Sequence, residues 1–123
     1  MIKNIIFDLS EVIISGYHGV ENVIAQNTNI SAEEFLNRKE ETINIFLDTM
    51  RGKYTEDEYL EHLLNGTNWN ITKEKMKLLI RKNLNISVNG TMDIIKKLRV
   101  NYNLILLSDH VKEWIDYIFK NNT

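Results

Sequence analysis

The sequence predicts an α/β fold in which a helical segment is inserted between two parallel strands. Two apolar runs, residues 2–7 and residues 103–107, each end at polar residues, a pattern typical of strands buried on both faces of a parallel sheet. The chain between them carries apolar residues at helical spacing. Because parallel strands require a crossover connection, a helix directly before the second run favours parallel pairing.

The first helices of the inserted segment are predicted from capping residues and apolar spacing. A short helix is expected over residues 20–26. Ser31 and Glu34 match a capping box, in which each side chain satisfies a free backbone amide of the other residue. The helix that they open is expected to continue to Gly52, with one apolar face made of Phe35, Ile43, Phe46, Leu47 and Met50.

Further helices are predicted on both sides of the second strand. The capping signature returns at Thr55, which opens a helix through residue 64, and Thr72 begins another. A helix over residues 91–99 leads into the second strand, and a helix over residues 110–120 follows it. The helix that begins at Thr72 has an apolar face made of Met76, Leu79, Ile80 and Leu84.

Length, charge and composition limit the classes of function. The 123 residues predict one domain, and the 15 basic and 17 acidic residues are interleaved, which argues against a phosphate track for nucleic acid. The absence of cysteine excludes a thiolate metal site. The N-terminal apolar run is interrupted by Asp8, so it is too short for a signal peptide or a membrane span. We therefore expect a cytoplasmic protein with no nucleic-acid or membrane partner.

Polar residues stand at the carboxyl ends of both predicted strands. Asp8-Leu9-Ser10 follows the first run, and Ser108-Asp109-His110 follows the second. Ligands of open α/β sheets bind at this edge. Burial at the end of a strand would make ionisation of Asp8 costly unless a cation or hydrogen-bond donors compensate. The pattern alone leaves two interpretations open, a functional carboxylate or a residue that caps a turn.

Residues 5–13, Ile-Ile-Phe-Asp-Leu-Ser-Glu-Val-Ile, resemble the first motif of the haloacid dehalogenase-like (HAD) hydrolase superfamily. Residues 104–110, Leu-Ile-Leu-Leu-Ser-Asp-His, resemble the second, and residues 52–59 and 88–91 are similar to the helical cap and its return to the core. The resemblance implies a partial Rossmann-like HAD core with parallel strands and a small α-helical cap. The core would comprise residues 1–15 and 88–123, and the cap residues 16–87.

The resemblance also implies a chemistry for the residues at the strand ends. Asp8 would attack a small phosphorylated substrate and form an aspartyl-phosphate that water then hydrolyses. Mg²⁺ would be held by the Asp8 carboxylate and the main-chain carbonyl of Ser10. Ser108 would bind a phosphate oxygen. Asp109 and His110 lie beside it as candidate substrate-binding residues, although a helix-start role for His110 is an equal alternative.

Two departures from the family pattern stand out. Ser10 occupies the position where many phosphatases of the family carry a second aspartate as general acid, and a hydroxyl cannot supply a proton with the pKa of a carboxyl group. The family's third motif supplies a lysine and its fourth supplies acidic metal ligands, and no residues after Ser108 match them. We therefore expect a chain truncated before these motifs, with weak activity or none.

Two other interpretations remain open. The chain could be a non-catalytic binding or interaction protein on a decayed HAD scaffold, with self-association through an exposed sheet edge. Alternatively, Asp8 could serve in halide displacement, a chemistry that needs no metal. Sensitivity to a chelator separates the two enzymatic interpretations.

Overall fold

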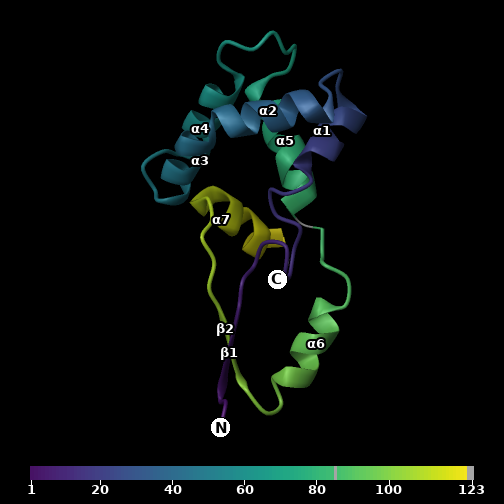
Figure 1. Cartoon of the computed structure of the whole chain (residues 1–123), viewed down its shortest axis with the longest axis vertical. Coiled ribbons are helices and arrows are strands. Elements are labelled where there is room, and N and C mark those ends of the chain that lie inside the picture. The colour runs from purple at the N-terminus through teal and green to yellow at the C-terminus, as the bar shows by residue number, and fades with distance from the viewer. Residues whose placement is uncertain (85, 122–123) are drawn as a thin grey trace.

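The computed structural model describes residues 1–84 and 86–121, and the parts of the predicted segments that fall on residues 85, 122 and 123 lie outside the described residues. The helices and strands follow the predicted order (Figure 1). In chain order they are β1 (Asn4–Phe7), α1 (Val20–Asn27), α2 (Ala32–Glu41), α3 (Ile43–Met50), α4 (Glu56–Leu64), α5 (Lys73–Leu84), α6 (Thr91–Leu98), β2 (Asn103–Leu106) and α7 (Lys112–Asn121). Within the described ranges, no helix is long and apolar enough to cross a membrane.

The caps predicted from sequence are confirmed, but one predicted helix is two. Ser31 and Glu34 form both halves of the capping box of α2, and the Thr55 hydroxyl accepts the Glu58 amide at the start of α4. The helix expected to run from Ser31 to Gly52 is broken at Thr42. The Thr42 hydroxyl donates to the Arg38 carbonyl at 2.8 Å, and such a bond to the preceding turn bends helices.

The sheet confirms the predicted parallel pairing. In the described part of the chain, β1 and β2 form a two-stranded parallel sheet with Ile5 opposite Leu104 and Phe7 opposite Leu106. The Leu107 amide donates to the Phe7 carbonyl at 2.9 Å, which extends the pairing by one step beyond the named strands. The crossover from β1 to β2 passes through all the helices from α1 to α6.

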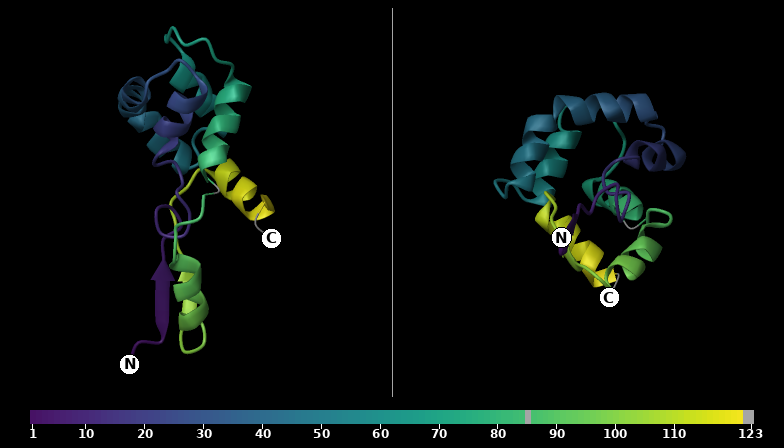
Figure 2. Two further views of the ribbon diagram at one scale, coloured as in Figure 1. Left: turned by 90° about the vertical axis from the view of Figure 1, so that its right-hand side faces the viewer. Right: turned by 60° about the horizontal axis from the view of Figure 1, so that its bottom comes forward.

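The expectation that both strands are buried on both faces is wrong. Ile6 is 60% exposed and Leu107 is 68% exposed. In the described residues the sheet has two strands, and α6, the helix nearest to them in Figure 2, contributes no buried residue. The two strands are therefore apolar, as predicted, but the described residues leave much of their apolar surface exposed to solvent.

The hydrophobic core lies instead among the helices, and α7 belongs to it. Figure 1 shows α7 beneath α3, α4 and α5, with the strands and α6 extending away at the other end. Trp114 of α7 is 1% exposed and packs with Tyr17 at a ring-centroid distance of 4.9 Å. The division into core residues 1–15 and 88–123 and cap residues 16–87 stays a prediction. The packing of α7 joins one end of the predicted core to the helices of the predicted cap.

A buried carboxylate connects α7 to α4 and α5. Glu56 at the start of α4 is 2% exposed, and it accepts hydrogen bonds from the Trp114 indole N–H and from Arg81, whose Nη2 lies 2.6 Å from Glu56 Oε1. Lys77 Nζ lies 3.6 Å from the same oxygen. The burial of Glu56 could not be predicted from the sequence, because nothing in the local pattern distinguishes it from the exposed acids beside it.

Candidate active site

The parallel sheet brings the two polar segments to one edge. Phe7 and Leu107 are joined by a backbone hydrogen bond, and Asp8 and Ser108 are the next residues on their strands. Asp8 is exposed, and its Oδ1 accepts the Leu9 amide at 2.7 Å. The sequence suggested that burial would make ionisation of Asp8 costly. Because Asp8 is exposed, this cost does not arise in this structure.

A second contact joins the two segments through their side chains. Ser10 Oγ lies 2.8 Å from His110 Nε2, although the two residues are 100 positions apart in the chain. Burial lowers the pKa of the His110 ring, while the charge of Asp8 and the backbone of Val111 act in the opposite direction. Desolvation is the largest of these effects, so the neutral imidazole is favoured.

The turn after Asp8 presents Ser10 to this contact. The Glu11 amide donates to the Ile14 carbonyl at 2.6 Å, and Glu11 adopts a left-handed backbone with φ of 65°. Gly16, with φ of 67°, passes so close to Ser10 that an added Cβ would stand 2.7 Å from Ser10 Oγ. A glycine is therefore required there for both its backbone conformation and the space beside it.

A cavity of about 190 Å³ adjoins the Ser10–His110 contact. Its polar lining consists of Ser10, Glu11, His18, Asp109 and His110, and its apolar lining of Tyr17, Phe46, Met50 and Trp114. His18 also lies at this cavity, with its Nδ1 3.7 Å from Glu11 Oε1. A larger depression of about 680 Å³ is lined mainly by residues 27–30 and 68–72.

The aromatic wall of this cavity, made of Tyr17, Phe46 and Trp114, packs tightly within the hydrophobic core. Tyr17 Oη and Tyr59 Oη lie 2.8 Å apart. Burial raises the pKa of Tyr17 well above its usual range and that of Tyr59 to about 12, so both phenols stay protonated. The sequence offered no signal for this wall, because Tyr17, Phe46 and Trp114 come from three separate segments.

All of the site residues predicted from sequence thus lie at or near this sheet edge, but only some of them are in contact with one another. Ser10 and His110 are in direct contact, and Asp8 is close enough to His110 for its charge to act on the ring. Ser108 Oγ has a long contact of 3.5 Å to the Asp109 carbonyl, which is at the limit for a hydrogen bond. Ser108 and Asp109 therefore share the edge without a close side-chain contact to Asp8 that the structure records.

The donor set at this edge fits a hard cation only in part. Among the described residues, no group of three or more histidine, aspartate or glutamate side chains is placed to hold a metal ion. The Asp8 carboxylate is exposed, and the Ser10 carbonyl follows it by two residues. Carboxylate and carbonyl oxygens with water completing the shell are the ligands that Mg²⁺ prefers.

Solved structures with a similar fold include proteins of the HAD family. A HAD family enzyme from Bacteroides thetaiotaomicron, solved in complex with magnesium and inorganic phosphate, matches with a TM-score of 0.67 and 24% identity over 98% of this chain. A predicted HAD-hydrolase from Bacillus subtilis, YfnB, bound to magnesium, matches with a TM-score of 0.60 and 16% identity over 98% of this chain. At these identities the likeness is one of fold, and it confirms the fold implied by the sequence motifs.

The comparisons also limit what can be transferred. The chain spans 60% of the Bacteroides enzyme and 59% of the Bacillus protein. No protein-family model matches the sequence, and neither does any curated protein. The activity of the longer proteins is therefore a hypothesis for this chain.

Proposed function

We propose that this chain, which has the fold of the HAD-family enzymes, serves a magnesium-dependent phosphohydrolase that acts on a small phosphate ester. The observation that carries the proposal is the parallel pairing of β1 with β2, which sets Asp8 and Ser108 at one sheet edge. Open α/β sheets bind their ligands at this edge. The Bacteroides neighbour with the same fold was solved with magnesium and phosphate, which supports this class of ligand.

In this proposal Asp8 is the nucleophile. One carboxylate oxygen attacks phosphorus, the bond from phosphorus to the ester oxygen breaks, and the leaving oxygen takes a proton to become an alcohol. Water then attacks the phosphorus of the aspartyl-phosphate, which releases inorganic phosphate and restores the carboxylate. The exposed position of Asp8 leaves its outer oxygen open to the substrate.

Binding of the phosphate would fall to the second strand end. The Ser108 hydroxyl would donate to a phosphate oxygen that is not transferred, and the free amides at the start of α7 suit an anion. The Asp8 carboxylate and the Ser10 carbonyl would hold Mg²⁺, which neutralises charge between the carboxylate and the phosphate when bound. Asp109 and His110 would contact the rest of the substrate.

The presence of serine rather than an acid at position 10 affects the expected rate of phosphate-ester hydrolysis. Many phosphatases of the family carry an acid there, and a hydroxyl cannot replace its proton. The ring of His110 contacts the Ser10 hydroxyl in this structure at 2.8 Å. We therefore propose that the Ser10–His110 pair contacts the leaving oxygen, with lower activity than an acid at position 10 would give.

The test is magnesium-dependent hydrolysis of an aryl phosphate by the 123-residue chain and its Asp8→Asn variant. Asp93→Asn, which removes an exposed carboxylate on α6, is the matched control. We expect activity that is lost in Asp8→Asn and with a chelator, and retained in Asp93→Asn. Acid-quenched intact mass spectrometry should show an added phosphoryl group on the unsubstituted chain alone. Equal turnover by Asp8→Asn would refute the assignment of the nucleophile.

A binding protein on the same scaffold is the second candidate. It is favoured by Ser10 in place of an acid. This candidate predicts that magnesium and phosphate together raise the melting temperature, in an Asp8-dependent manner, without turnover. Activity that survives a chelator would instead support halide displacement.

Self-association is proposed as well, through the apolar residues that the sheet leaves exposed. Ile6, Ile105 and Leu107 are all exposed on the two strands, and uncovered strands of this kind pair readily with other chains. Sedimentation velocity of the chain and of a Leu107→Lys variant tests this proposal. A concentration-independent monomer for the unsubstituted chain would contradict it.

A further inference from the structure

The cavity beside Ser10 and His110 carries an inference about the substrate that rests on the proposed function. Ser10 follows Asp8 by two residues, and His110 follows Ser108 by two, so the cavity adjoins the edge where a phosphoryl group would be transferred. Asp8 and Ser108 do not line it in the described structure. The phosphate would therefore sit at the edge, and the leaving group would enter the cavity.

Some polar atoms of the lining are paired with protein partners, whereas the buried Nδ1 of His110 has none among the described residues. Ser10 Oγ bonds His110 Nε2 at 2.8 Å, and Glu11 Oε1 lies 3.7 Å from His18 Nδ1. The Tyr17 hydroxyl bonds Tyr59 at 2.8 Å. A ligand with several hydroxyl groups would have to replace some of these paired contacts, and burial of an unpaired hydroxyl is unfavourable.

The charges of the lining also select against anionic leaving groups. Glu11 and Asp109 bring two carboxylates, and the lining of the described cavity contains no lysine or arginine. What remains for a ligand to contact is the apolar wall of Tyr17, Phe46 and Met50. These side chains offer ring edges and a thioether, which pack well against another ring.

The size of the cavity suits a small ligand. Its volume is about 190 Å³. An apolar protein cavity of about 150 Å³ is known to bind benzene. One six-membered ring therefore fits.

We infer that the leaving group of the substrate is a single small apolar ring, so that the substrate class is monocyclic aryl phosphate monoesters. The ring would lie against Phe46 and Met50 with its ester oxygen directed to Ser10 and His110. We expect sugar phosphates and bicyclic aryl phosphates to bind less well, the first because their hydroxyl groups compete with paired polar groups and the second because the cavity is small.

Binding of non-hydrolysable phosphonates to the full 123-residue chain tests the inference without requiring turnover. In magnesium, phenylphosphonate should bind roughly tenfold more tightly than methylphosphonate in calorimetry, because burial of the ring adds apolar contact. Naphthylphosphonate should bind no better than methylphosphonate, and glucose 6-phosphate should compete weakly. Equal affinity for phenyl- and methylphosphonate, or binding of neither, would overturn the inference.

Two variants that change the cavity in opposite directions make the test specific. Met50→Trp fills the cavity and should abolish the preference for phenyl over methyl, while Phe46→Ala enlarges it and should admit the naphthyl ring. Leu78→Ala, on the exposed face of α5, is the control and should change neither preference. Circular dichroism confirms that each variant is folded, and either cavity variant that folds is sufficient. Unchanged preferences in a folded cavity variant would overturn the inference.

These outcomes separate the inference from the proposed function. If phenylphosphonate binds preferentially and aryl phosphates are not hydrolysed, the cavity assignment stands and the catalytic proposal fails. If hydrolysis depends on Asp8 but shows no preference for monocyclic aryl esters, the catalytic proposal stands and the cavity assignment fails.

Discussion

Replacement of Glu56 by alanine removes the carboxylate that holds α7 against α4 and α5. Glu56 is 2% exposed and accepts hydrogen bonds from the Trp114 indole and from Arg81. The variant leaves the Trp114 N–H buried without an acceptor and the Arg81 guanidinium without its carboxylate. Because Lys112, the first residue of α7, follows His110 by two positions, the same change should loosen the wall of the cavity.

The expected loss of unfolding free energy follows from these contacts. Removal of one partner from a buried ion pair destabilises proteins by about 3–5 kcal/mol. A buried donor left without its partner accounts for about 1–3 kcal/mol of such a loss. Arg81 is 26% exposed at its side chain, so water partly solvates the guanidinium and the lower end of the range applies. We expect a loss of about 3 kcal/mol for Glu56→Ala.

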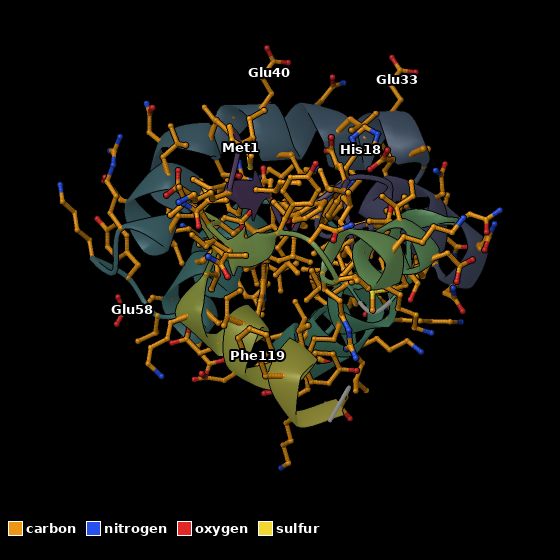
Figure 3. All side chains as sticks on the ribbon, turned by 90° about the horizontal axis from the view of Figure 1, so that it is seen from below. Met1, His18, Glu33, Glu40, Glu58 and Phe119 are labelled. Carbon is orange, nitrogen blue, oxygen red and sulfur yellow. The ribbon has the colours of Figure 1, made fainter. Side chains whose placement is uncertain are left out.

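Urea denaturation followed by tryptophan fluorescence and far-ultraviolet circular dichroism measures this loss. Glu58→Ala is the matched control, because Glu58 lies in the same turn and Figure 3 shows its side chain pointing away from the molecule. The control should change stability by less than about 0.5 kcal/mol. Glu56→Gln keeps an acceptor oxygen and should fall between the two. If Glu56→Ala costs no more than Glu58→Ala, Glu56 does not hold α7 in place.

Three further changes test other parts of the structure. Gly16→Ala should destabilise the fold by more than Gly66→Ala in thermal melts, since both glycines have positive φ but only Gly16 would clash with Ser10; equal losses would contradict the close approach. Arg38→Lys should cost about 1–3 kcal/mol in urea melts, because Arg38 donates to three carbonyls at the end of α4; an unchanged midpoint would show these bonds to be dispensable. The capping contact with Ser31 lowers the pKa of Glu34 below 4.5, so its stabilisation should be present above that pH and disappear as the pH falls through the folded pKa. Melting temperatures of Glu34→Gln and the unsubstituted chain should therefore converge in acid, and a constant difference would contradict the cap.

Local patterns in the sequence predicted most of the elements and the residues of the site edge. The Ser31 and Thr55 caps, the two apolar strand runs and the helix before β2 depend on neighbours within a few positions, so they can be read from the chain itself. The parallel pairing followed from the same pattern, and with it the meeting of Asp8 and Ser108 at one edge.

The tertiary structure alone decided how these elements share a core. The break at Thr42, the burial of Glu56 and the packing of Trp114 under the helices depend on contacts between segments far apart in the chain. The exposure of Ile6 could not be predicted either, because an apolar run has the same pattern whether or not another layer covers it.

The same distinction applies to the site. The sequence pattern predicted the fold class and placed Asp8, Ser10, Ser108 and His110 at strand ends, and the resemblance to the HAD motifs made them site candidates. Only the folded chain brought Ser10 Oγ to His110 Nε2 across 100 residues and enclosed a cavity beside them with aromatic rings from three segments. Periodicity specifies which face of an element is apolar, whereas the partner of that face is selected by packing over the whole chain.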